Sequence, residues 1–79
     1  MTPHQACLYD LGLYLKERAR EAVRTRNVLP KGSESRDFQD GRVLAFNEAI
    51  SIVQQTAEGL GIPLAELRLD DIVPDRDLS

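Results

Sequence analysis

The chain has 79 residues, one cysteine and a formal net charge of −3. A single core in a domain of this size seldom contributes more than ~3–5 kcal/mol, so small domains commonly add disulfides, a metal or oligomerisation. The lone Cys7 excludes a disulfide within the chain. There is no basic leader segment and no apolar run near the ~18–20 residues of a membrane span. These features predict one soluble, cytoplasmic domain over residues 1–79 with no membrane contact.

A first helix is predicted over about residues 3–26. Thr2 and Gln5 have the spacing of a capping box, and Pro3 falls at the first helical position, where its missing N–H costs nothing. Gly12 weakens the pattern, because glycine costs about 1 kcal/mol relative to alanine in a helix interior. Apolar residues at spacings of three and four predict the core face of this helix, at Leu8, Leu11, Leu15, Ala19 and Ala22.

A connecting loop is predicted where Pro30 and Gly32 interrupt the helical pattern. A second helix should follow over about residues 36–60. Three residues before or near its start can accept a hydrogen bond from its first free N–H groups, so the N-cap is Ser33, Ser35 or Asp37. The short loop predicts that the two helices pack antiparallel as a hairpin.

The second predicted helix is apolar over two adjacent rows. The row predicted to pack against the first helix contains Val43, Phe46, Ile50, Val53, Ala57 and Leu60. The row beside it contains Phe38, Gly41, Ala45, Ala49, Ile52 and Thr56. Together the rows span about 200°, whereas one packing partner needs a stripe of about 100°. One neighbouring helix is therefore not expected to cover both rows.

A second copy of the chain is the predicted cover for the additional row. The expected homodimer interface consists of Gly41, Ala45, Ala49 and Ile52, where small residues allow another backbone to approach closely. The predicted fold class is therefore all-α: an antiparallel two-helix hairpin that dimerises into a four-helix bundle. The alternative is that the first helix alone, or the C-terminal segment, covers the row. A parallel and an antiparallel dimer both fit the pattern.

A short helical turn and an arm are predicted over residues 62–79. Gly61 suits the left-handed position after the second helix, since Ile62 can then contact Ala57 in a Schellman motif. Pro63 can begin a single helical turn through Leu67. The remaining residues mix apolar and acidic side chains and predict an arm over the open end of the bundle, in its own chain or on the partner. Its last residues are expected to be mobile.

Charge is divided unevenly along the chain. Residues 1–36 carry a net +3 and residues 37–79 a net −6. A basic patch is predicted on the first helix at Arg18, Arg20, Arg24 and Arg26. Such a patch could contact phosphates in a nucleic acid, yet the acidic pI and the lack of interleaved aromatics favour a solvated face partly paired with downstream acids. Nucleic acid is therefore an alternative partner and not the main one.

No motif for catalysis or for a cofactor is evident. His4, Cys7 and Asp10 follow one another at spacings of three, but a zinc site needs three or four ligands and Asp10 points well around the helix. The favoured interpretation is that Cys7 is a small core residue and His4 an exposed one. A phosphate-binding glycine loop and a nucleophile with its base are likewise not found.

The sequence predicts a small noncatalytic protein-interaction module, without metal or cofactor, that forms a homodimer. Another protein could bind to the acidic arm and the exposed face of the second helix, and the arm could inhibit a basic partner. A nucleic-acid-associated regulatory factor is the first alternative. An enzyme or metal protein centred on His4 and Cys7 is the second. The sequence names neither the biological process nor the identity of a partner.

Overall fold

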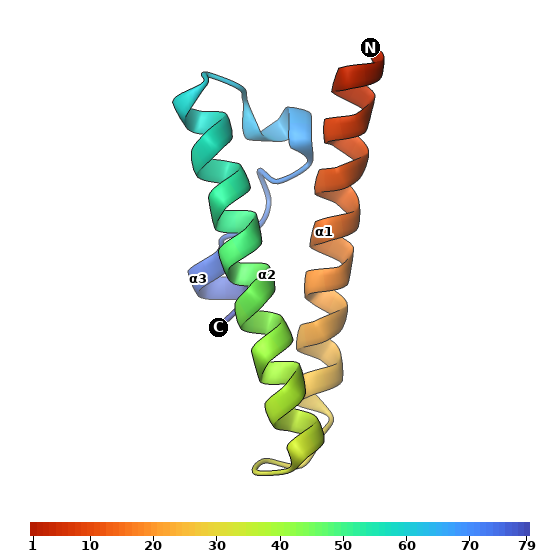
Figure 1. Cartoon of the computed structure of the whole chain (residues 1–79), viewed down its shortest axis with the longest axis vertical. Helices are drawn as coiled ribbons and strands as arrows, with labels where there is room; N and C mark the ends of the chain where they lie inside the picture. Colours follow the sequence, from red (N-terminus) through yellow and green to blue (C-terminus); the bar gives the residue numbers. More distant parts are fainter.

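The computed structural model describes all residues from Met1 to Ser79, and its regular secondary structure is all helical, with no strand. Two long helices, α1 (Pro3–Asn27) and α2 (Glu34–Gly59), lie side by side and antiparallel (Figure 1). A 3-10 turn, η1 (Leu64–Leu67), and a one-turn helix, α3 (Pro74–Asp77), follow. The predicted hairpin of two packed helices with a short C-terminal turn is confirmed. None of the helices combines the length and the hydropathy needed to cross a bilayer.

The start of α1 has the predicted capping box. The Gln5 N–H donates to the Thr2 hydroxyl at 3.1 Å, and the Thr2 N–H donates to the Gln5 side-chain oxygen at 2.8 Å. Pro3 occupies the first turn, as expected. These contacts satisfy two N–H groups near the start of the helix, which explains why α1 begins here.

The start and end of α2 also follow from local chemistry. Of the three candidate N-caps, Ser33 is the one used: its hydroxyl accepts from the Arg36 N–H at 3.2 Å. At the other end, the Ile62 N–H donates to Ala57 at 2.8 Å and Gly61 has φ +71°. This is the predicted Schellman motif, and the left-handed glycine ends the helix.

The predicted core face of α1 is correct at Ala19 and Ala22, with Leu15 partly buried, and wrong at Leu8 and Leu11. Leu8 and Leu11 are exposed, and Gly12 and Lys16 are buried with Ala19 and Ala22. The prediction failed in the first half of the helix because it assigned the bulky Leu8 and Leu11 to the core in place of Gly12 and Lys16. Small residues allow η1 and α2 to approach α1 closely, and Gly12 touches the backbone of Leu67.

The predicted seam of α2 is correct except at its end. Val43, Ile50 and Ala57 are buried, and Phe46 and Val53 pack partly buried against them. Leu60 is exposed, contrary to the prediction. It follows the last residue of α2, at the end of the hairpin where α1 and α2 diverge (Figure 1).

The C-terminal arm lies along one face of the hairpin in its own chain, behind α2 in the view of Figure 1. Its apolar residues Leu67, Leu69, Ile72 and Leu78 complete the core. The arm was predicted to lie over the open end of the bundle with mobile last residues; it instead runs along one face of the hairpin, and Leu78 near its end is part of the core. Leu78 is 1% exposed, because it packs into the core beside α2.

Side chains of the hairpin hold this arm mainly by its backbone carbonyls. Lys16 donates to the Arg68 carbonyl at 2.6 Å, and the Gln54 amide donates to the Leu69 and Ile72 carbonyls at 3.0 and 2.9 Å. The Asn47 amide donates to the carbonyls of Pro74 and Leu78 at 3.0 and 3.2 Å. Because each otherwise buried carbonyl gains a donor, the arm can pack closely without forming a regular helix.

Candidate interaction surface

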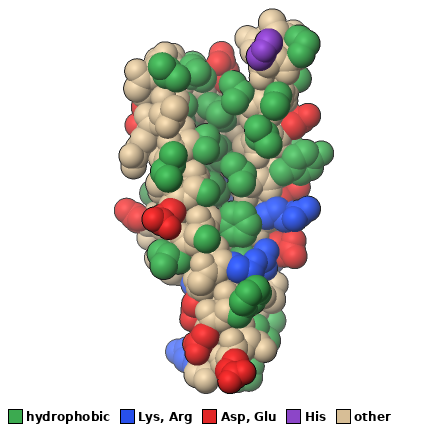
Figure 2. Space-filling model, viewed as in Figure 1, with side chains coloured by type: hydrophobic (Ala, Val, Ile, Leu, Met, Phe, Trp, Pro, Cys, Tyr) green, Lys and Arg blue, Asp and Glu red, His purple; other side chains and the backbone are tan.

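The arm covers only one side of the hairpin, and the other side is apolar and open. Figure 2 shows a green area running over both long helices on this side. We call it the uncovered face; it consists of Leu8, Leu11 and Leu15 of α1 with Phe38, Ala45, Phe46, Ala49 and Ile52 of α2. Leu11 is 54% exposed, Ile52 62% and Phe38 67%. Scattered apolar residues are normal on a surface, but a contiguous set on two packed helices is typical of an interaction site.

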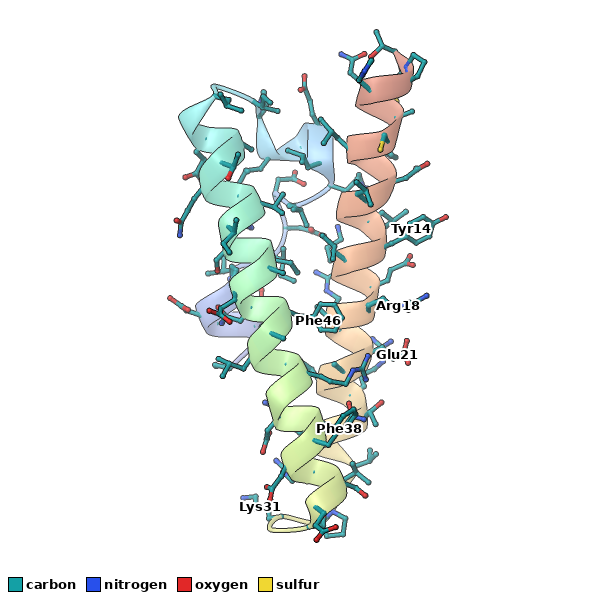
Figure 3. All side chains as sticks on the ribbon, viewed as in Figure 1. Tyr14, Arg18, Glu21, Lys31, Phe38 and Phe46 are labelled. Atoms are coloured by element: carbon teal, nitrogen blue, oxygen red, sulfur yellow. The ribbon has the colours of Figure 1, made fainter.

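A shallow groove of about 330 Å³ lies at the centre of the uncovered face. It is lined by Leu15 of α1 and by Arg42, Ala45, Phe46 and Ala49 of α2. The Arg42 guanidinium lies 5.8 Å from the centre of the Phe46 ring and donates to Gln39 at 2.9 Å. Phe46 points into the space between the helices in Figure 3. The groove is therefore mostly apolar, with one cation stacked at its side.

The structure places the predicted dimer-interface residues on or beside this face. Ala45 and Ala49 line the groove, and Ile52 is exposed one turn beyond Ala49. Gly41 is exposed at the margin, and a Cβ added there would meet nothing within 4 Å. The arm lies against the opposite side of α2, where Asn47 and Gln54 bind it. The predicted alternative, in which the first helix or the arm covers this row, does not describe the structure.

The predicted basic patch is divided by the fold. Arg20 lies 3.6 Å from Asp71, and Arg26 lies 3.6 Å from Asp40. Arg18 and Arg24 form no ion pair, but they are six residues apart and lie on different sides of α1. The four arginines therefore do not form one continuous basic surface.

His4 and Cys7 are both exposed near the start of α1. The prediction that Cys7 is a core residue was wrong, because the side of α1 that carries Cys7 and Leu11 faces solvent and not α2. Asp10 is exposed as well. No group of three or more His, Cys, Asp or Glu side chains is placed to hold a metal ion.

Sequence reasoning missed Lys16, the buried cation that orients the arm. Its side chain is 5% exposed, and its ammonium donates to Asp71 at 2.8 Å. This hydrogen bond lowers the pKa of Asp71 below its usual value of 3.8. Near the end of the arm, Arg76 and the Val73 N–H lower the pKa of Asp77 to about 2. The ionised Asp71 carboxylate thus helps to attach the arm to α1, whereas the Asp77 carboxylate forms its hydrogen bonds within the arm.

Acid is expected to weaken this attachment. A carboxyl whose pKa is lower in the folded than in the unfolded state stabilises the fold at high pH, and this stabilisation is lost as pH falls through the folded pKa. The free energy of unfolding should therefore fall as pH drops from about 4 towards 2. Asp71→Asn should be less stable than the wild type at pH 7, with the difference shrinking in this range. Urea unfolding monitored by circular dichroism at several pH values would measure the free energy of unfolding of both proteins. If their difference did not change with pH, the role of Asp71 would be contradicted.

Comparison with known proteins adds no further information. The sequence matches no protein-family model, and no curated protein or solved structure is significantly similar to it.

Proposed function

We propose that this chain is a small noncatalytic protein-interaction module that forms a homodimer through the uncovered face. The observation that carries the proposal is the continuous apolar surface on the side of the hairpin that the arm leaves open. A second hairpin on this surface produces a four-helix bundle, in which each long helix has neighbours on two sides.

Two further observations support self-association. The core of the single chain is small, with nine buried apolar residues, four of them alanine or valine. Chains of this size commonly gain stability from oligomerisation. The small side chains of Ala45 and Ala49 also leave room for another helix to approach the groove. Burying the exposed Leu11, Phe38 and Ile52 would remove three large apolar side chains from water.

The variants Ala45→Arg and Ala49→Arg are expected to convert the dimer to a monomer. Each places a long charged side chain in the groove, whose lining has no acidic residue to pair with it, and leaves the hairpin core unchanged. We expect at least a tenfold loss of association, or about 1.4 kcal/mol. Helix content by circular dichroism should stay the same. Sedimentation velocity at micromolar concentration would measure the change in mass.

Leu44→Arg is the matched control. Leu44 is 64% exposed and precedes Ala45 by one residue, about 100° around α2 and away from the groove. This variant should remain a dimer. A stable monomer in the wild type, or equal association in all variants, would contradict the proposed function.

A further inference from the structure

We infer that, in the dimer proposed above, α1 of each chain packs against α2 of its partner, around a two-fold axis parallel to the helices. This inference rests on the proposed function, because it specifies how two uncovered faces meet. The other symmetric arrangement has its axis perpendicular to the helices and places α1 on α1 and α2 on α2. Size, shape and charge each distinguish the two.

The sizes of the side chains differ between the two halves of the uncovered face. On α1 the row of Leu11 is bulky and continues beside the uncovered face with Tyr14 and Arg18, and Tyr14 is 59% exposed. On α2 the centre of the corresponding row is small, with Ala45 and Ala49, and the bulky Phe38 and Ile52 lie towards its two ends. Pairing α1 with the partner's α2 places large side chains over small ones, as helix packing requires. Pairing like helices would place bulky rows on bulky rows and leave space between the small ones.

The hairpin is also wider at one end. The long helices are close together near the connecting loop and diverge towards the end where the chain begins (Figure 1). Rotation about an axis parallel to the helices places the wide end of one copy over the wide end of the other. Each helix then lies over a helix along its whole length. The perpendicular axis would place the wide end over the narrow end, so the helices could stay in contact only near the centre.

Charge supports the same arrangement. Arg18 lies two turns after Leu11 on the same side of α1, and Glu48 lies one turn before Ile52 at the outer edge of α2. Neither forms an ion pair within its own chain. In Figure 2 the α1 side of the green area carries a basic side chain among acidic ones, and acidic side chains lie on the α2 side. The parallel axis brings opposite charges together, whereas the perpendicular axis places the two Glu48 side chains near each other.

Cys7 provides a direct test of the arrangement, because it is the only thiol and is exposed. It lies one turn before Leu11, facing the same side. Since Leu15 lies level with Ala45, Phe46 and Ala49, Cys7 lies level with residues near Thr56 of α2, which is two turns after Ala49. In the proposed dimer Cys7 therefore faces Thr56 of the partner subunit. With the perpendicular axis it would lie near Thr25 of the partner subunit.

The experiment compares wild type, Thr56→Cys and Thr25→Cys under mild oxidation, each analysed by non-reducing electrophoresis and sedimentation velocity. We expect at least a tenfold larger disulfide-linked dimer fraction in Thr56→Cys than in the other two. A larger disulfide-linked fraction in Thr25→Cys than in Thr56→Cys would overturn the arrangement. So would a protein that sediments as a dimer but shows no increase in that fraction in either variant. Both results would leave the proposed function intact. A wild type that sediments as a monomer would instead overturn the proposed function and this inference with it.

Discussion

Gly12→Ala is expected to destabilise the fold, although glycine-to-alanine changes ordinarily stabilise a helix interior by about 1 kcal/mol. A Cβ at position 12 would overlap the Leu67 carbonyl oxygen and lie 2.7 Å from the Leu67 carbonyl carbon. The clash involves backbone, so a change of rotamer cannot relieve it. We expect η1 to move away from α1. The free energy of unfolding should fall by about 1–3 kcal/mol, as it does when a core is overpacked.

Gly59→Ala is the control for this effect. Gly59 is the last residue of α2, and a Cβ there would meet nothing within 4 Å. The free energy of unfolding of Gly59→Ala should equal that of the wild type or exceed it by a few tenths of a kcal/mol. Urea unfolding of both variants, followed by circular dichroism, would compare them. If Gly12→Ala were as stable as Gly59→Ala, the close contact of α1 with η1 would be wrong.

Helix ends could be predicted from the sequence because each depends on residues a few positions apart. The Thr2 capping box and the Gly61 Schellman motif need only a short stretch of chain to form. The choice among the three caps of α2 could not be made from such patterns. Ser33 is used because the helix begins at Glu34, and the loop places its hydroxyl against the Arg36 N–H.

The position of the arm could not be predicted from local patterns. Lys16, Asn47 and Gln54 are polar residues at helical positions, and such residues usually face solvent. Their partners are carbonyls up to 52 residues away in the sequence. One signal was present: Asn47 and Gln54 are seven residues apart and therefore lie on one side of α2. The apolar residues of the arm had to pack against some side of the hairpin. The polar residues Asn47 and Gln54 mark the side of α2 on which the arm packs.

The interaction surface also combines a part that local sequence predicts with a part that depends on distant contacts. The second apolar row of α2 was predicted because its width exceeded what one helix covers, and Ala45 and Ala49 do line an open groove. The contribution of α1 was missed, since Leu8 and Leu11 were assigned to the core. Gly12 and Lys16 take the core positions instead, because η1 approaches Gly12 and the arm accepts hydrogen bonds from Lys16. Both choices depend on contacts that form only when the arm is in place.

Two isoleucines of α2 should separate the stability of the fold from association. Ile50 is fully buried at the centre of the core, and Ile52 is on the uncovered face. Ile50→Ala leaves a cavity and is expected to lower the free energy of unfolding by about 2–5 kcal/mol. This loss is comparable to the whole stability expected of a small core. Ile52→Ala removes the same atoms from an exposed site and should change the stability of the monomer little.

The concentration dependence of unfolding would distinguish the two effects. If only the folded chain dimerises, the midpoint of thermal unfolding of the wild type rises with protein concentration, because association stabilises the folded state by mass action. Ile52→Ala should reduce this dependence, since it removes part of the proposed interface. Ile50→Ala should lower the midpoint at every concentration and keep the dependence. If Ile52→Ala kept the concentration dependence and Ile50→Ala lost it, the solvent-facing side of α2 would not mediate assembly.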